Sequence, residues 1–163
     1  TLTASSDLNV GTIKDATGTN TAMTIDSNGI VSQGTTVYSR ASHGSNTGPA
    51  AYITFDSHRE SNGGITFVDT NTAMQVPVAG LYLVGFNALG NTGSGSFSMQ
   101  IRKNGSAITT GGNITQDTTN DNDCMGFNTV DVLAANDKIQ FYVSAGVSHG
   151  NASYNNFFCV KIG

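Results

Sequence analysis

Histidine and serine are the residues of this sequence that could most readily do catalytic chemistry. The chain contains His43, His58 and His149, and it is rich in serine. A histidine beside a serine can take the hydroxyl proton and turn the oxygen into a nucleophile. Each histidine, however, lies in a polar turn without a dedicated carboxylate pattern to orient it. We therefore predict that the protein is not an enzyme.

Two of the histidines stand in copies of one tripeptide, Ser42-His43-Gly44 and Ser148-His149-Gly150. We expect both copies to be exposed loops, because glycine and serine are typical turn residues. The alternative is that the two copies meet at a subunit interface. Assembly would then respond to pH, since imidazole titrates near neutrality.

An acidic loop runs from Asp117 to Asp123 with the sequence Asp-Thr-Thr-Asn-Asp-Asn-Asp. Its side-chain oxygens are ligands of the kind that calcium prefers, but the spacing is not that of an EF-hand and the closing glutamate is missing. We expect a solvated polar loop and no cofactor. Calcium bound at Asp121 and Asp123 is the alternative.

Composition indicates an all-β protein. Only 11% of the 163 residues are charged, 37% are hydrophobic, and 20 are glycine. Helix formers are scarce, whereas β-branched and turn residues are common. Phenylalanine, tyrosine, valine and isoleucine recur at regular intervals, which argues against disorder. The length suits one domain, or one domain with an arm.

Charge and hydropathy also exclude some partners. The net charge is −4, from 7 Lys and Arg against 11 Asp and Glu. Because no basic stripe is present, we expect no nucleic acid. No apolar run approaches the ~20 residues of a membrane helix, so we expect no membrane partner.

The stretch from Met74 to Ala88 organises the rest of the chain. In this segment Leu81 and Leu83 point one way, and the alternate residues point the other way. Both faces are apolar, which predicts a strand that is covered on both sides. The last segment, Phe157 to Ile162, is also apolar on both faces and should lie inside a sheet.

The length of the apolar segments divides the chain into two parts. In the arm, residues 1–34, these segments are very short, and in the head, residues 35–163, they are longer. Asn28-Gly29 and Asn104-Gly105 are hairpin signals, because a type I′ turn needs positive φ at both central residues. A short hairpin buries too little to stand alone, so the arm needs another surface. The apolar residues expected to anchor it are Ile13, Met23, Ile25 and Ile30.

The two cysteines, Cys124 and Cys159, lack the spacing of a metal site. We expect both to be buried thiols, since free cysteine prefers protein interiors. A single disulfide between them is the alternative.

The second part of the chain contains four distinctive blocks, Pro77 to Tyr82, Arg102 to Gly105, Leu133 to Ile139 and Asn156 to Val160. In order and spacing they resemble the globular head of the first complement component and its relatives in the tumour-necrosis-factor superfamily. The resemblance implies a jelly-roll sandwich of about ten strands that assembles as a homotrimer. No collagen-like Gly-X-Y stalk accompanies it.

In a trimer of this type one sheet faces the threefold axis, where aromatic residues bury against their symmetry mates. The alternative is that these aromatics fill the core of one subunit. For each adjacent pair, strand alternation predicts that one residue lies at the trimer interface and the other lies in the core. The candidates are Tyr82, Phe86, Phe141, Tyr142, Phe157 and Phe158.

The arm has a different resemblance. Ile13 to Gly29 is similar to segments of bacteriophage structural proteins, which implies a location in the virion. We expect a trimeric knob that decorates or cements the capsid, with the major capsid protein as partner. The alternative is the tip of a tail fibre that recognises glycans on the host surface.

Overall fold

The computed structural model describes residues 12–14, 21–25, 31–33, 36–91, 95–108, 113–118 and 124–163. The chain divides into two compact units, Thr1–Thr36 and Val37–Gly163. All regular structure in the described residues is β-strand. No apolar helix in this part of the chain reaches the length that crossing a membrane requires.

The N-terminal unit contains a small antiparallel sheet of three strands in the order β1-β2-β3. Its strands are β1 (Thr12–Lys14), β2 (Thr21–Ile25) and β3 (Val31–Gln33). Ile13 pairs with Met23, and Ile25, which is 37% exposed, pairs with Val31. The predicted turn at Asn28-Gly29 and the predicted anchor Ile30 lie outside the described residues.

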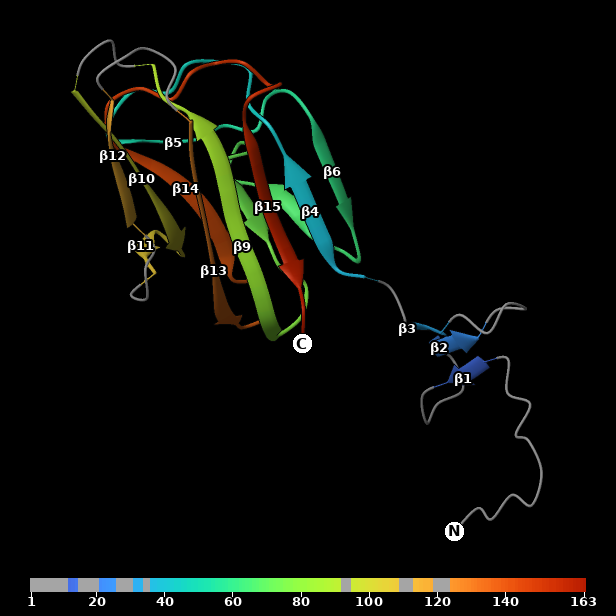
Figure 1. Cartoon of the computed structure of the whole chain (residues 1–163). Helices are drawn as coiled ribbons and strands as arrows, with labels where there is room; N and C mark the ends of the chain where they lie inside the picture. Colours follow the sequence, from blue (N-terminus) through green and yellow to red (C-terminus); the bar gives the residue numbers. More distant parts are fainter. Residues whose placement is uncertain are drawn as a thin grey trace, which may run out of the picture. The chain divides into compact units, whose positions relative to one another are not determined.

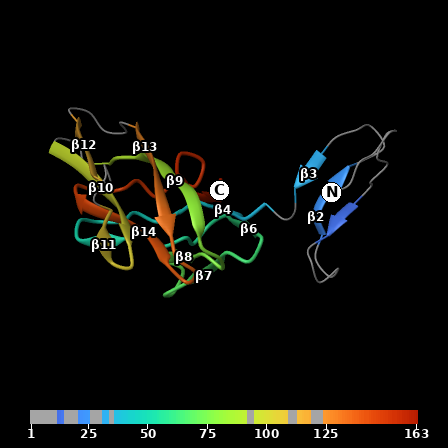
Figure 2. The ribbon, with the colours of Figure 1, turned by 90° about the horizontal axis from the view of Figure 1, so that it is seen from below.

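The second unit is a sandwich of two antiparallel sheets (Figures 1 and 2). One sheet has five strands in the order β13-β9-β15-β4-β6. Its strands are β4 (Tyr38–Ala41), β6 (Arg59–Asn62), β9 (Gly80–Leu89), β13 (Cys124–Leu133) and β15 (Asn156–Lys161). The terminal strand β15 therefore lies in the middle of this sheet, as its apolar sequence predicts.

The other sheet has seven strands, with the path β11-β10-β14-β8-β7, and with β12 paired to β10 and β5 paired to β14. Its strands are β5 (Ala51–Tyr52), β7 (Thr66–Val68), β8 (Ala73–Gln75), β10 (Gly95–Lys103), β11 (Ser106–Ala107), β12 (Asn113–Thr118) and β14 (Lys138–Ala145). The prediction of an all-β jelly-roll sandwich is confirmed.

The turn between β10 and β11 follows directly from its sequence. Asn104 and Gly105 have φ of 52° and 83°, so both central residues occupy the left-handed region that a type I′ turn requires. The flanking residues Lys103 and Ser106 pair across the hairpin. The predicted hairpin is therefore present.

Aromatic rings from both sheets meet in the core. Phe86 and Phe157 come from the five-stranded sheet, Phe141 comes from β14, and Phe55 comes from the loop after β5; their exposed fractions are at most 1%. The ring centroids of Phe141 and Phe157 lie 5.0 Å apart, and those of Phe86 and Phe141 lie 6.0 Å apart. Tilted and edge-to-face ring pairs of this kind add to the free energy gained by burial.

The cysteines depart in part from the sequence-based expectation. Both are free thiols, and Cys159 is buried. Cys124, however, is exposed, so the prediction of two buried thiols is wrong for this residue. The reason is strand alternation in β13, which turns Met125 into the core and Cys124 away from it.

We predict that Phe157→Ala lowers the free energy of unfolding by about 3–5 kcal/mol, because it removes a buried ring and leaves a cavity. Urea unfolding at a fixed protein concentration measures the change. Tyr154→Ala is the matched control, since Tyr154 is 55% exposed and should change stability by about 0.5 kcal/mol or less. Equal losses for the two variants would contradict the assignment of Phe157 to the core.

Candidate interaction surface

Strand β9 is apolar on both faces, but one copy of the chain covers only one of them. Tyr82, Val84 and Phe86 point into the core and are at most 1% exposed. On the opposite face Leu81 is 38% exposed, and Leu83 is half-buried. The prediction of cover on both sides therefore holds within a single chain for the inner face only.

The uncovered apolar surface extends over three neighbouring strands. Val130, Leu83 and Val160 are cross-strand partners in one row, and Val132 pairs with Leu81 in the next row. Val130 is 44% exposed and Val132 is 66% exposed. We call this surface the outer sheet face. It comprises Leu81, Leu83, Val130, Val132, Phe158, Val160 and Ile162.

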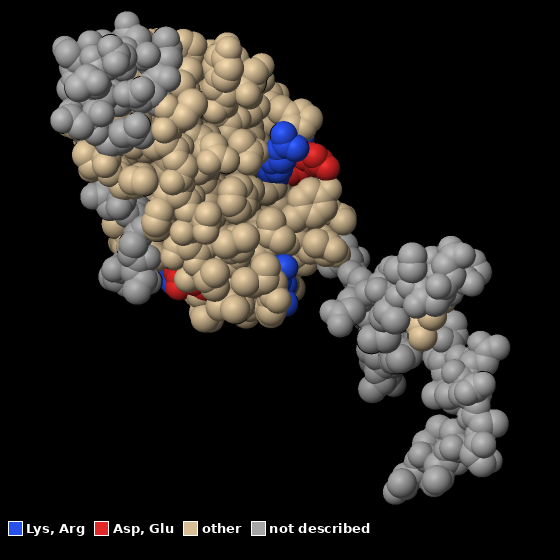
Figure 3. Space-filling view, viewed as in Figure 1, with Lys and Arg blue, Asp and Glu red and all other residues tan. Residues whose placement is uncertain are grey.

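Charged side chains lie at the margins of this face. Figure 3 views the molecule from the side of β9 and β15 and shows lysine, arginine, aspartate and glutamate only as small patches near the edges of the described surface. Covering the centre of the face would therefore remove few charges from water. The cost of desolvating charged groups is therefore small for this surface.

Phe158 lies flat against the outer sheet face because its cross-strand partner is a glycine. A Cβ atom built on Gly85 would lie 2.5 Å from Cζ of Phe158 and 2.8 Å from the carbonyl oxygen of Phe127. The ring thus occupies the space that a side chain at position 85 would fill. This close approach joins β15 to β9 in a continuous apolar surface.

The six predicted interface or core aromatics fall in three places. Phe158 lies on the outer sheet face. Tyr142 lies on the outward side of the other sheet, where the guanidinium carbon of Arg102 is 3.5 Å from its ring centroid. Each sheet of the sandwich thus has one of these aromatic side chains on its outward side, but only Phe158 belongs to the outer sheet face. The remaining four are buried between the sheets: Tyr82, Phe86, Phe141 and Phe157.

The predicted calcium ligands Asp121 and Asp123 lie outside the described residues. Among the residues that the structure does describe, no group of three or more His, Cys, Asp and Glu side chains could hold a metal ion. The expected solvated loop therefore stays a prediction, and calcium at Asp121 and Asp123 stays its alternative.

The two Ser-His-Gly copies come together within one chain. Nε2 of His43 is 2.9 Å from Oγ of Ser148, and Thr47 and Ser148 form an antiparallel bridge between the two loops. His43 is 1% exposed, so the expectation of an exposed loop histidine is wrong for this residue. The bridge turns the ring inward, where it packs edge-on against Phe157 with centroids 5.8 Å apart.

The environment of His43 favours its neutral form. Burial lowers the pKa of His43 below its ordinary value of 6.5, and the nearby His149 lowers it further. Asp56 and the backbone of Ser45 act in the opposite direction and do not outweigh burial. Nδ1 of His43 and Nδ1 of His149 are both buried, without a hydrogen-bond partner among the described residues.

Ser148 also stands at the centre of Gly146-Val147-Ser148-His149-Gly150, the Gly-x-Ser-x-Gly spacing of a nucleophile elbow. Our sequence-based prediction of a non-enzyme assumed that this spacing does not occur in the chain, and that assumption is wrong. A functional elbow exposes its serine at a turn between a strand and a helix, whereas Ser148 is 0% exposed in a loop that leads to another strand. The pair formed by Ser148 and His43 therefore holds two loops together and is closed to substrate.

Comparison with known proteins defines the class of fold. No protein-family model matches the chain, and no curated protein matches it. Among solved structures, it is similar to Eiger TNF from S. frugiperda, with a TM-score of 0.61 and 14% identity over 78% of this chain and 93% of that chain. It is also similar to rabbit GITRL, with a TM-score of 0.55 and 14% identity over 78% and 94%. The chain thus has a jelly-roll fold of the tumour-necrosis-factor type.

We predict that acid weakens this fold through His43. Its pKa is lower in the folded chain than in the unfolded chain, so the unfolded chain binds the proton more readily. Stability should be complete above the unfolded value of 6.5 and fall as the pH drops toward the lower folded pKa. The melting temperature at about pH 7.5 and at about pH 5 measures this loss.

The exposed His58 supplies the control for this experiment. His58→Asn should keep the acid-induced fall in melting temperature, whereas His43→Asn should reduce it even if that variant starts from a lower value. An equal fall in the wild type and in both variants would show that His43 is not the group responsible.

Proposed function

We propose that the protein is a non-enzymatic structural protein that assembles as a homotrimer through the outer sheet face. The observation that carries the proposal is a contiguous, uncharged, apolar surface across β13, β9 and β15. Large exposed apolar patches mark interaction sites, because leaving them in water is unfavourable. The four sequence blocks that resemble trimeric jelly rolls support the same symmetry.

A closed ring of identical subunits explains why this face is apolar in every copy. In a cyclic trimer each subunit contacts two neighbours, so the outer sheet face of every copy is buried near the threefold axis. The ring closes, and no copy leaves its apolar face exposed to water. The buried pair of Ser148 and His43 supports the non-enzymatic part of the proposal, since substrate cannot reach the serine hydroxyl in this arrangement.

We expect the wild-type chain to have a mass in solution of three times the 16.8 kDa of one chain. Val130→Lys should shift the protein toward the mass of a single chain, because burying an unpaired ammonium in the interface is strongly unfavourable. Size-exclusion chromatography with light scattering measures both masses.

Thr66→Lys is the matched control for this substitution. It adds the same charge at an exposed position of β7, in the sheet that does not carry the apolar face, and should leave the mass unchanged. A monomeric wild type at tens of micromolar would refute the trimer. Equal dissociation by the two variants would refute the choice of face.

We further propose that the trimer is a bacteriophage virion protein, a knob that decorates or cements the capsid and contacts the major capsid protein. The support is the similarity of Ile13 to Gly29 to phage structural segments. A threefold knob suits threefold or quasi-threefold points between capsomers, and an arm adds contact area across the seams between them. Ile13, Met23, Ile25 and Ile30 are the proposed anchors.

Removal of residues 1–34 is expected to abolish attachment to capsids while leaving the trimer intact, because the arm supplies the anchoring surface. Co-sedimentation with capsids that lack this protein measures attachment, and light scattering of the same sample verifies the trimer. Full attachment of the truncated chain would contradict the role of the arm.

The alternative function is the receptor-binding tip of a tail fibre that recognises host glycans. A polar hollow beside the outer sheet face, described below, favours it. Electron cryomicroscopy of intact virions separates the two functions. Density at capsid threefold positions supports decoration, and density at the ends of fibres supports receptor binding.

A further inference from the structure

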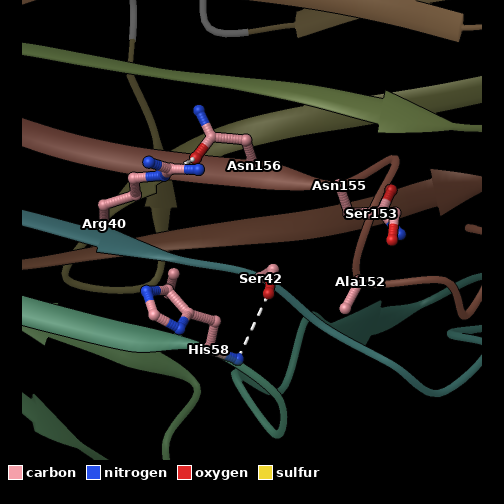
Figure 4. Close-up of a pocket in the computed structure, with 8 residues that line it drawn as sticks. Arg40, Ser42, His58, Ala152, Ser153, Asn155 and Asn156 are labelled. Carbon is pink, nitrogen blue, oxygen red and sulfur yellow. Dashed lines mark hydrogen bonds between the residues drawn. The ribbon is translucent and has the colours of Figure 1, made fainter.

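A polar hollow of about 310 Å³ opens where β4 and β15 lie side by side, and the loop before β15 lines it through Ala152 and Ser153 (Figure 4). Its polar lining residues are Arg40, Ser42, His58, Ser153, Asn155 and Asn156. No carboxylate is among the lining residues, so hydrogen-bond donors dominate the site. The volume is at the lower end of the range for small-molecule sites, about 300–1,000 Å³.

Arg40 is oriented but not neutralised. Its Nε donates a hydrogen bond of 2.9 Å to Oδ1 of Asn156, and Figure 4 shows the two side chains directed toward each other. Glu60 is the cross-strand partner of Arg40, yet its carboxylate instead accepts a hydrogen bond of 2.8 Å from the Tyr38 hydroxyl. Among the described residues Arg40 forms no ion pair, and both of its terminal nitrogens remain available.

The side chains around Arg40 suit a polyhydroxylated ligand. Ser42 accepts a hydrogen bond of 3.2 Å from the His58 backbone and keeps its own proton to donate. The Ser153 hydroxyl and the Asn156 amide nitrogen offer further donors. The His58 ring, 64% exposed, lies at the rim and is 3.9 Å from Glu60. A guanidinium with two free nitrogens matches a carboxylate in bidentate geometry.

We propose that this hollow binds an acidic sugar, with the sugar carboxylate on Arg40 and the sugar hydroxyls on Ser153 and Asn156. The size of the hollow suits one sugar ring. The inference goes beyond the proposed trimer and does not need the virion location. It names the chemical class of sugar that the protein would bind under the alternative function of glycan recognition.

The test is isothermal titration of the full-length chain, in its measured oligomeric state, with glucuronic acid and N-acetylneuraminic acid. Glucose and N-acetylglucosamine are the neutral comparisons, and acetate supplies a carboxylate without a sugar. We expect at least one acidic sugar to bind more tightly than all three comparisons. Equal binding of a neutral sugar or of acetate would overturn the proposal.

Arg40→Gln should weaken binding of the acidic sugar about tenfold or more, because it removes the charged half of the contact. Arg59→Gln is the matched control, since it removes the same charge from exposed β6 outside the hollow, and should leave affinity unchanged. Equal weakening by both variants would mean general electrostatic attraction and would refute a site at Arg40.

Amide chemical shifts of the wild type make the test independent of whether Arg40→Gln folds. The acidic sugar should shift the Ser42, Ser153 and Asn156 signals and leave those of β7 in place. A chain that sediments as a trimer and binds neither acidic sugar would overturn this inference while leaving the trimer standing. A chain that is monomeric and binds an acidic sugar would refute the trimer and support this inference.

Discussion

A strand in a two-sheet sandwich has two faces, and the sandwich can bury only one of them. This constraint governs the head of the protein. The inner face of β9 packs through Phe86 onto Phe141 of the opposite sheet, and Phe157 of β15 packs against the same ring. These contacts bring the two sheets together and fix which side chains of each strand point inward. Because successive side chains alternate, they also fix which side chains face outward.

The apolar side chains that the core does not bury also need a physical explanation. Folding of one chain does not require Val130 and Val132 to be apolar, because both are largely in water. Polar residues at these positions would keep the strand and improve solubility. In the proposed trimer another copy covers the face in a second burial step, after folding. The proposed trimer thus accounts for a cost that the monomer leaves unexplained.

Much of the fold could be predicted from alternation and turn chemistry. The apolar character of both faces of β15 predicts an interior strand, and Asn104-Gly105 predicts its hairpin, because each signal is local. The exposure of Cys124 also follows from alternation with Met125, but our prediction relied on the general preference of free cysteine for interiors. The position of His43 could not be predicted from a local signal. Whether a loop histidine is buried depends on a contact with Ser148, 105 residues away, and no local pattern encodes that distance. The repeated Ser-His-Gly tripeptide was the available signal, but repetition alone does not imply contact.

The outer side of the five-stranded sheet changes character along its length. Toward the end of β15 it carries Leu81 and Val132, and toward the start of β15 it carries Asn87 and Asn156. Phe158 and its cross-strand partner Arg40 share the row between these two ends. An interface centred on Leu81 and Val132 gains free energy from burial and can end before it covers Arg40. An assembly that covered the whole face would bury Arg40 beside Glu60 without a direct ion pair, at a large cost in free energy. The physical chemistry of one surface therefore favours self-association at one end and leaves the other end open to a polar ligand.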